Sequence, residues 1–158
     1  MTHPILKGCA LTLVAPIVFG AAPAAAQFGP PPADFPDMVN HNPVFNADLG
    51  SRGSAAFAGV LDPATGRLCY MINVPGLDQV TMAHIHKGAA GENGAPVVPL
   101  TAPTGGSSNG CATLAPDLVK AIVANPGGYY VNVHTAAFPG GATRGQLERT
   151  PGLDDRPG

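Results

Sequence analysis

Two histidines separated by one residue stand directly before a glycine-rich stretch in the run AHIHKGAAGENG, which begins at Ala83. Alternate side chains of an extended strand point to the same face, so His84 and His86 would lie on one side and Ile85 on the other. Paired imidazoles on one face are a donor set that transition metals use. The spacing therefore predicts a metal-binding strand, and the alternative is a pair of solvated or hydrogen-bonded histidines.

A third histidine, His134, ends the run YYVNVH further along the chain. Val131 and Val133 alternate with it, so this histidine also falls on the face opposite the apolar residues. If the two strands are neighbours, cross-strand Cβ separations of about 5 Å would let three imidazoles converge. We therefore expect a metal site made of His84, His86 and His134.

Copper is the metal that this donor set favours. Copper binds such ligands more tightly than zinc in the Irving–Williams order, and Met82 on the same strand face offers a soft thioether for Cu(I). Zinc with an activated water is the alternative. Met82 would otherwise fill a surface groove, and His41 is either a fourth ligand or a solvated linker histidine. Glu92 is either an acceptor for an imidazole N–H or an ordinary loop acid.

Arg144 is the candidate catalytic residue. It stands in the run ATRGQLER, on the side of a predicted strand opposite Leu147. A guanidinium near an open metal position would attract and orient a small anion such as superoxide. The alternative is a surface ion pair with Glu148 or Glu92. A copper carrier would gain nothing from this cation, so Arg144 separates an enzyme from a carrier.

Short strands must position these residues, because apolar residues alternate with period two through most of the chain. The sequence pattern predicts one short helix over residues 115–128, with Pro116 in its first turn, and a loop over residues 101–110. The pattern predicts an all-β fold, a Greek-key β-sandwich or barrel with one short helix. The predicted strands are 53–61, 67–74, 79–86, 95–100, 128–137 and 142–149.

The N-terminal residues predict export to the periplasm or the exterior. A short region with Lys7, an apolar run and an Ala-x-Ala motif ending at Ala26 form the layout of a cleaved signal peptide. The apolar run is too short and too interrupted to span a bilayer. We expect a signal peptide (1–26), a proline-rich arm (27–45), one folded domain (46–150) and a disordered tail (151–158).

The charge balance argues against nucleic acid or an anionic membrane as the partner. The chain has a formal net charge of −2, and loss of Lys7 with the signal peptide would make it about −3. Charged residues are only 11% of the chain, whereas it contains 21 glycines and 18 prolines. This composition is typical of a turn-rich β protein.

Two cysteines, Cys69 and Cys111, would remain after signal cleavage. In an oxidising compartment an even pair predicts a disulfide, which would stabilise the fold by roughly 3–4 kcal/mol. The alternative, a pair of thiolate metal ligands, lacks the usual C-x-x-C spacing.

Two stretches resemble the signature blocks of the chordin-type (CHRD) domain family. They are AHIHKGAAGENGAPVVPL and GYYVNVHTAAFPGGATRGQL, the second pairing Tyr-Val-Asn-x-His-Thr with Arg-Gly-Gln-Leu. The resemblance covers roughly residues 53–149 and implies a secreted β-sandwich. It also implies an alternative function, a protein-interaction module in which the histidines serve only a hydrogen-bond network.

A second resemblance is to copper-zinc superoxide dismutases, which are Greek-key barrels with His-x-His on one strand and another copper-binding His on a later strand. An active-site Arg and an intradomain disulfide complete that order, as Arg144 and the cysteines do here. No histidine lies between His86 and His134, so the metal-bridging histidine and the zinc ligands are absent. The resemblance implies a copper-only superoxide dismutase-like enzyme, and a non-catalytic periplasmic copper carrier or store is the alternative.

Overall fold

The computed structural model describes residues 31–33, 38, 42–50 and 55–150. The predicted signal peptide, His41 and the predicted tail lie outside these residues.

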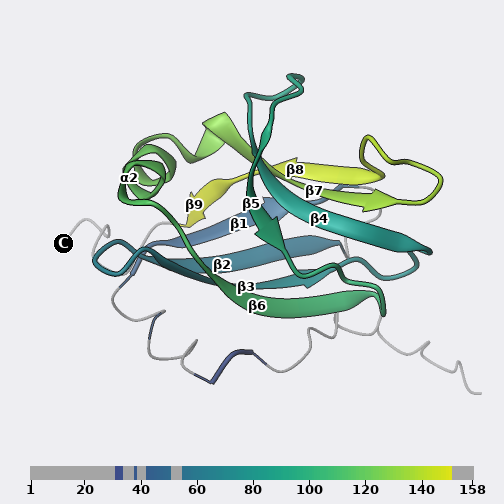
Figure 1. Ribbon diagram of the computed structural model, residues 1–158, viewed down its shortest axis with the longest axis horizontal. Coiled ribbons are helices and arrows are strands. Elements are labelled where there is room, and N and C mark those ends of the chain that lie inside the picture. The colour runs from purple at the N-terminus through teal and green to yellow at the C-terminus, as the bar shows by residue number, and fades with distance from the viewer. Residues whose placement is uncertain (1–30, 34–37, 39–41, 51–54, 151–158) are drawn as a thin grey trace, which may run out of the picture.

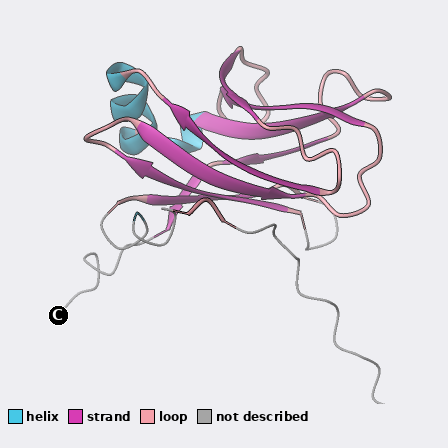
Figure 2. Cartoon of the chain, turned by 60° about the horizontal axis from the view of Figure 1, so that its bottom comes forward, coloured by secondary structure: helices cyan, strands magenta, loops and turns pink. Residues whose placement is uncertain are grey.

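Two antiparallel sheets pack face to face and form the predicted all-β sandwich with one short helix (Figures 1 and 2). In the five-stranded sheet the order is β6 (Ser107–Thr113), β3 (Arg67–Asn73), β2 (Ala56–Asp62), β1 (Val44–Asp48) and β9 (Glu148–Thr150). In the four-stranded sheet the order is β5 (Pro96–Leu100), β4 (Val80–Lys87), β7 (Tyr129–Thr135) and β8 (Thr143–Gln146).

The hydrophobic core lies between the sheets and follows the period-two pattern of the strands. Phe57 and Ile72 face it from the five-stranded sheet, and Ile85 and Val131 face it from the four-stranded sheet, all at most 1% exposed. Burying a side chain of this size stabilises the fold by about 1.5–3 kcal/mol. Because alternate residues of β4 and β7 are committed to this core, the histidines must point to the opposite face.

One end of the sandwich is covered by helix α2 (Pro116–Ala124), as predicted (Figure 1). Proline opens the helix where no backbone N–H is needed, and Val119 and Ile122 are its buried residues. A short 3₁₀ turn, η1 (Pro126–Gly128), leads directly into β7. Among the described residues no helix is long and apolar enough to cross a membrane.

Three details differ from the sequence prediction. Strand β1 begins at Val44, two residues inside the predicted proline-rich arm. Strand β6 starts within the predicted loop 101–110, because an edge strand held by its backbone ladder with β3 needs no large apolar side chains. The predicted strand 142–149 divides at the buried Leu147 into β8 and β9, which belong to different sheets.

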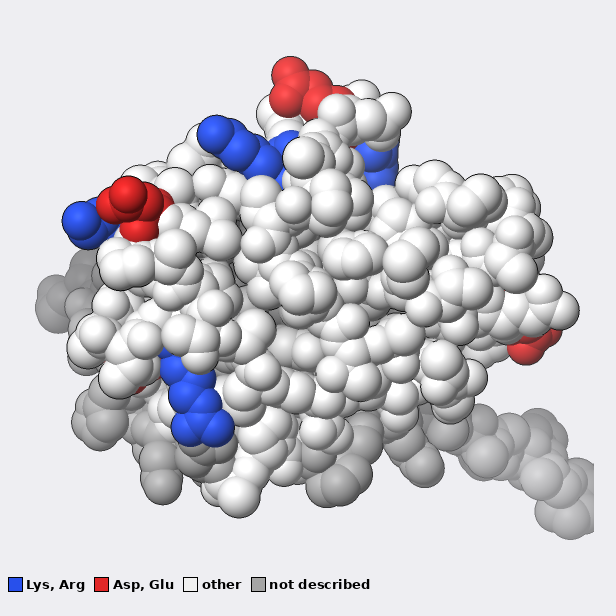
Figure 3. Space-filling model, in the orientation of Figure 1, with Lys and Arg blue, Asp and Glu red and all other residues white. Residues whose placement is uncertain are grey.

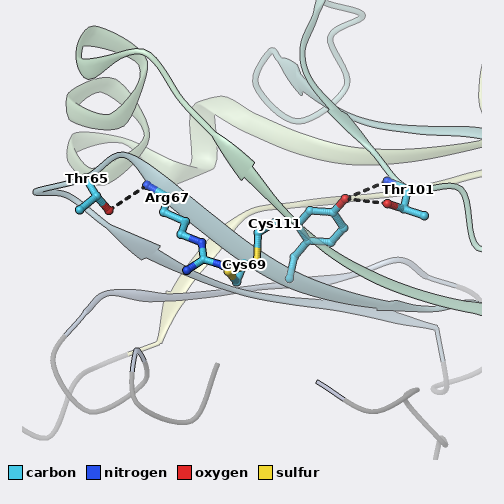
Figure 4. The surroundings of a disulfide bond; sticks show 6 residues. Thr65, Arg67, Cys69, Thr101 and Cys111 are labelled. Atoms are coloured by element: carbon cyan, nitrogen blue, oxygen red, sulfur yellow. Dashed lines mark hydrogen bonds between the residues drawn. A yellow bond between two sulfur atoms is a disulfide. The ribbon is translucent and has the colours of Figure 1, made fainter. Parts of the chain in front are cut away.

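The predicted disulfide between Cys69 and Cys111 is present (Figure 4). The two residues are direct partners in the ladder between β3 and the edge strand β6, with their Cα atoms 4.0 Å apart. A guanidinium N–H of Arg67 contacts the Cys111 sulfur at 3.6 Å. The bond therefore ties the edge strand to its sheet.

Replacing both cysteines with alanine is expected to lower the free energy of unfolding by about 3–4 kcal/mol, because the bond closes a loop with a sequence separation of 42. Urea unfolding of the parent and of the double variant would measure this difference. Parent treated with a reductant is the matched control and should behave like the variant. Equal unfolding midpoints for oxidised and reduced parent would contradict a stabilising role.

Candidate metal centre

The structure brings the three predicted histidines together on the outer face of the four-stranded sheet. His84 and His86 come from β4, and His134 comes from the adjacent antiparallel strand β7. One ring nitrogen from each histidine lies within 4.8 Å of those of the other two. Three imidazole nitrogens this close together can surround a single metal ion.

Strand β4 is irregular before the histidine pair and again within it. Its register against β7 shifts between Val80 and Met82, and its register against β5 shifts between Ile85 and His86. Such bulges change the local twist and re-aim side chains, and they are common next to functional sites. The two shifts therefore help to turn side chains of a single strand toward one point.

Backbone carbonyls fix the protonation of two of the imidazoles. Nδ1 of His86 lies 2.9 Å from the carbonyl oxygen of Gly94, and Nδ1 of His134 lies 2.9 Å from that of Pro139. A carbonyl only accepts hydrogen bonds, so each Nδ1 must carry the hydrogen. Each Nε2 is therefore left with the lone pair that a metal requires, an arrangement typical of metal-binding histidines.

The Nε2 atoms of His134 and His86 have different surroundings. Nε2 of His134 lies 3.3 Å from Nδ1 of His84, which must then be the donor. Nε2 of His86 is buried and has no hydrogen-bond partner. A buried polar atom without a partner costs about 1–3 kcal/mol, and a metal ion would supply the missing bond. The donor set and this orphaned nitrogen therefore fit a transition metal.

His84 is the most exposed member of the cluster, whereas His86 and His134 are 8% and 6% exposed. Partial burial lowers the pKa of His84, and the neighbouring imidazoles His134 and His86 lower it further by repulsion between positive charges. Both effects favour the neutral form of the His84 ring, which is the form that can bind a metal.

The carbonyl that holds His86 belongs to the connection between β4 and β5, residues 88–95, which projects from the sandwich (Figure 1). Its Gly94 donates its backbone N–H to the hydroxyl of Tyr130 at 3.1 Å. The Tyr130 ring stacks on the His86 imidazole with centroids 5.0 Å apart and planes at 16°. One loop and one tyrosine thus set both the direction and the plane of the His86 ring.

The carbonyl that holds His134 belongs to the connection between β7 and β8. In the same connection, the Gly140 carbonyl accepts a hydrogen bond from the side-chain amide of Asn132 at 3.2 Å. A Cβ on Gly141 would lie 2.3 Å from that amide, so glycine is required where the loop crosses Asn132. The close packing keeps this loop against the face that carries the histidines.

Arg144 does not belong to the histidine cluster. Its Nη1 donates to the side chain of Asn93 at 2.9 Å and to the backbone carbonyl of Glu92 at 3.2 Å. Its guanidinium carbon lies 5.1 Å from the centre of the Tyr130 ring, which also stacks on His86. Strand β7 lies between β4 and β8, and Arg144 is the ladder partner of Asn132, which is in turn opposite His84.

The other two candidate residues that the structure describes, Glu92 and Met82, lie in different parts of the structure. The Glu92 carboxylate accepts the backbone N–H of Ala89 at 3.0 Å, which closes a turn within the projecting loop. Met82 lies directly opposite His134 in the ladder and is 46% exposed. Met82 is therefore an exposed apolar side chain next to the cluster. Phe138, in the loop beyond His134, is 61% exposed.

Sequence reasoning missed the groups that orient the imidazoles. Gly94 and Pro139 act through their carbonyls, and a carbonyl leaves no signature in residue type. Period two places Tyr130 on the strand face of His134, but its contact with His86 depends on strand pairing. The glycine-rich composition of the 88–95 loop was the one visible signal, since a Cβ on Gly94 would lie 1.4 Å from the Lys87 carbonyl oxygen.

Comparison with known families finds a match to the CHRD domain over residues 38–147. The matched segment contains all three clustered histidines and both cysteines of the disulfide. Domains of this family are typically extracellular. Searches among curated proteins and among solved structures find no match.

Proposed function

The chain belongs to the CHRD-domain family, and we propose that this member binds one copper ion through His84, His86 and His134. The observation that carries the proposal is the buried, unpartnered Nε2 of His86, which belongs to the three-imidazole cluster. A histidine kept only for a hydrogen-bond network would have both ring nitrogens satisfied. Here the second nitrogen, Nε2 of His86, is buried and has no hydrogen-bond partner.

Copper suits this site better than zinc. Affinity for nitrogen ligands rises to copper and falls again at zinc, so three imidazoles favour copper when both metals are present. The cluster consists of imidazoles, and among the described residues no carboxylate belongs to it. Magnesium and calcium prefer oxygen ligands, so the site does not suit them. Met82, exposed and opposite His134, is a candidate additional donor for Cu(I).

The proposal is tested by metal titration of the purified chain without a histidine tag. Competition with a chelator should give one tightly bound copper per chain, with zinc bound more weakly. Copper should also raise the unfolding temperature, because a ligand that binds only the folded state stabilises it. Equal affinity for copper in a variant lacking all three histidines would refute the proposed site.

We place this copper site outside the cytoplasm. The support is the predicted signal peptide at residues 1–26, the disulfide and the extracellular character of the family. Disulfides persist in oxidising compartments, and this one anchors an edge strand. Detection of the protein in the periplasm or the medium with Gln27 as its first residue would support this localisation, and retention of the uncut chain in the cytoplasm would refute it.

Dismutation of superoxide is the most concrete reaction for such a site, and a non-catalytic copper carrier or store is the alternative. Copper, when bound, would supply one-electron chemistry by alternating between two oxidation states. The observation that favours an enzyme is positive charge near the site. Arg144 is exposed, and Lys and Arg atoms lie beside the base of the projecting 88–95 loop (Figure 3). This charge would draw an anion toward the cluster.

Replacing Arg144 with Gln is expected to lower the dismutase rate per bound copper by about tenfold at low salt, because an attractive charge is lost. Arg144→Lys is the matched control, since it keeps the charge. The parent rate should fall as salt rises, because the attraction is screened over about 10 Å at 0.1 M ionic strength. Assays with a superoxide-generating system, normalised to copper content, measure both effects. If the parent protein dismutates superoxide no faster per copper than a copper peptide does, the enzyme proposal fails and the copper carrier or store remains.

A further inference from the structure

The side chain of Gln146, on strand β8, ties three segments of the chain together. Its Nε2 donates to the backbone carbonyls of Gly88 at 3.1 Å, Gly127 at 2.7 Å and Tyr129 at 3.2 Å. These carbonyls belong to the start of the projecting loop, to η1 and to the start of β7. An amide has two N–H groups, so these three carbonyls share both of its hydrogens.

Strand β8 holds the same loop at a second point. Arg144 lies two residues before Gln146 and therefore on the same strand face. Its guanidinium donates to Asn93 and to the carbonyl of Glu92, near the far end of the loop. One side chain of β8 thus fixes the beginning of the 88–95 loop, and another fixes its end.

The contacts of this strand explain why its sequence reads Arg-Gly-Gln-Leu. A Cβ on Gly145 would lie 1.9 Å from the carbonyl oxygen of Asp48, so the strand packs against the β1 backbone on that side. Leu147 is 2% exposed and points into the core. The alternation leaves Arg144 and Gln146 together on the face that carries the loop.

The loop so held supplies the acceptor for His86. The Gly94 carbonyl accepts a hydrogen bond from Nδ1–H of His86. The Gly94 N–H donates to the hydroxyl of Tyr130, whose ring stacks on the His86 imidazole. The position of Gly94 therefore decides which nitrogen of His86 carries the hydrogen and where the free Nε2 points. A loop that moved by an ångström would misplace this lone pair.

We propose that Gln146, assisted by Arg144, is a positioning residue that sets the metal affinity of the cluster by fixing the 88–95 loop against His86. The inference rests on the proposed function, because it concerns the same three-histidine site. Gln146 acts through the loop backbone and contributes no metal ligand. Removal of the Gln146 side chain should therefore lower metal affinity in the same way as a partial loss of the His86 ligand, with His84 and His134 unaffected.

Gln146→Met is the test variant, because methionine keeps the length of the side chain and removes the donors. Competition of Cu(II) between the protein and a chelator should show affinity lowered about 10–100-fold, the usual cost of losing a partner behind a metal ligand. Gln146→Glu should be at least as damaging, since a carboxylate would face three carbonyl oxygens. Unchanged copper affinity in both variants would overturn the inference.

A double-mutant cycle separates positioning from general damage to the fold. In a His86→Ala background, Gln146→Met should weaken Cu(II) binding no further, because the residue it positions is gone. In a His134→Ala background the full 10–100-fold effect should remain. Equal effects in both backgrounds would show that Gln146 acts only on overall stability and would refute the inference.

Copper-free protein gives a second readout. In ¹⁵N NMR the Nδ1–H of His86 should exchange slowly in the parent and rapidly in Gln146→Met, because the hydrogen bond to Gly94 is weakened. Retention of slow exchange in the variant would contradict the inference. Failure of the parent to bind copper would instead overturn the proposed function and, with it, the link to metal affinity.

Discussion

Replacing His86 with Ala is expected to lower the copper affinity of the protein by more than about 100-fold, a larger effect than the loss of a group behind a ligand. The reason is that His86 contributes a buried nitrogen whose direction is fixed by Gly94 and Tyr130 before any metal arrives. Two remaining imidazoles cannot enclose the ion. His84→Ala and His134→Ala should have effects of the same order. Chelator competition with Cu(II) measures all three variants.

His41→Ala is the control for these variants, because it removes a histidine of the predicted proline-rich arm and leaves the three clustered histidines in place. Its effect on copper affinity should be much smaller. The unfolding midpoint of the copper-free protein is a second, independent measurement. Because Nε2 of His86 is buried without a partner, its removal offsets the loss of packing, and the copper-free variant should unfold at nearly the parent midpoint. Copper affinity that survives in His86→Ala would contradict the three-histidine site.

The second large effect is expected from Gly94→Ala. A Cβ at Gly94 would lie 1.4 Å from the carbonyl oxygen of Lys87, so the loop backbone must move. That movement would take the acceptor away from His86 and the donor away from Tyr130. We expect copper affinity to fall about 100-fold, at the upper end of what outer-sphere changes cost.

Gly91→Ala is the control within the same loop. Gly91 has φ +86°, so alanine costs about 1–2 kcal/mol of backbone strain there, but a Cβ would meet nothing within 4 Å. It should lower stability slightly and leave copper affinity nearly unchanged. If the two alanine variants bind copper equally well, the position of the Gly94 carbonyl does not control His86.

The convergence of the histidines could be predicted from the sequence because it depends on two periodic patterns. Period two placed His84 and His86 on one face, and the valines of β7 placed His134 on the corresponding face. What the sequence could not supply was the pairing of β4 with β7. Strand order depends on long-range contacts that residue types alone do not encode, so the pairing had to be assumed.

One strand that sequence reasoning misassigned contains no large apolar residue. Strand β6 reads SSNGCAT and is held by its ladder to β3 and by the disulfide, neither of which produces a hydrophobic pattern. The role of Arg144 shows the same limit. Its charge was visible, but its contacts with Asn93 and Glu92 became apparent only once the loop and β8 were placed side by side.

The metal content of the untagged protein, isolated from the compartment to which it is exported, tests the central claim most directly. Elemental analysis by mass spectrometry should find about one copper per chain and little zinc, because a three-imidazole site favours copper. The variant with alanine at His84, His86 and His134, prepared in parallel, should carry none. Parent protein that is free of copper after growth with ample copper, or a triple variant that retains as much copper as the parent, would contradict the account.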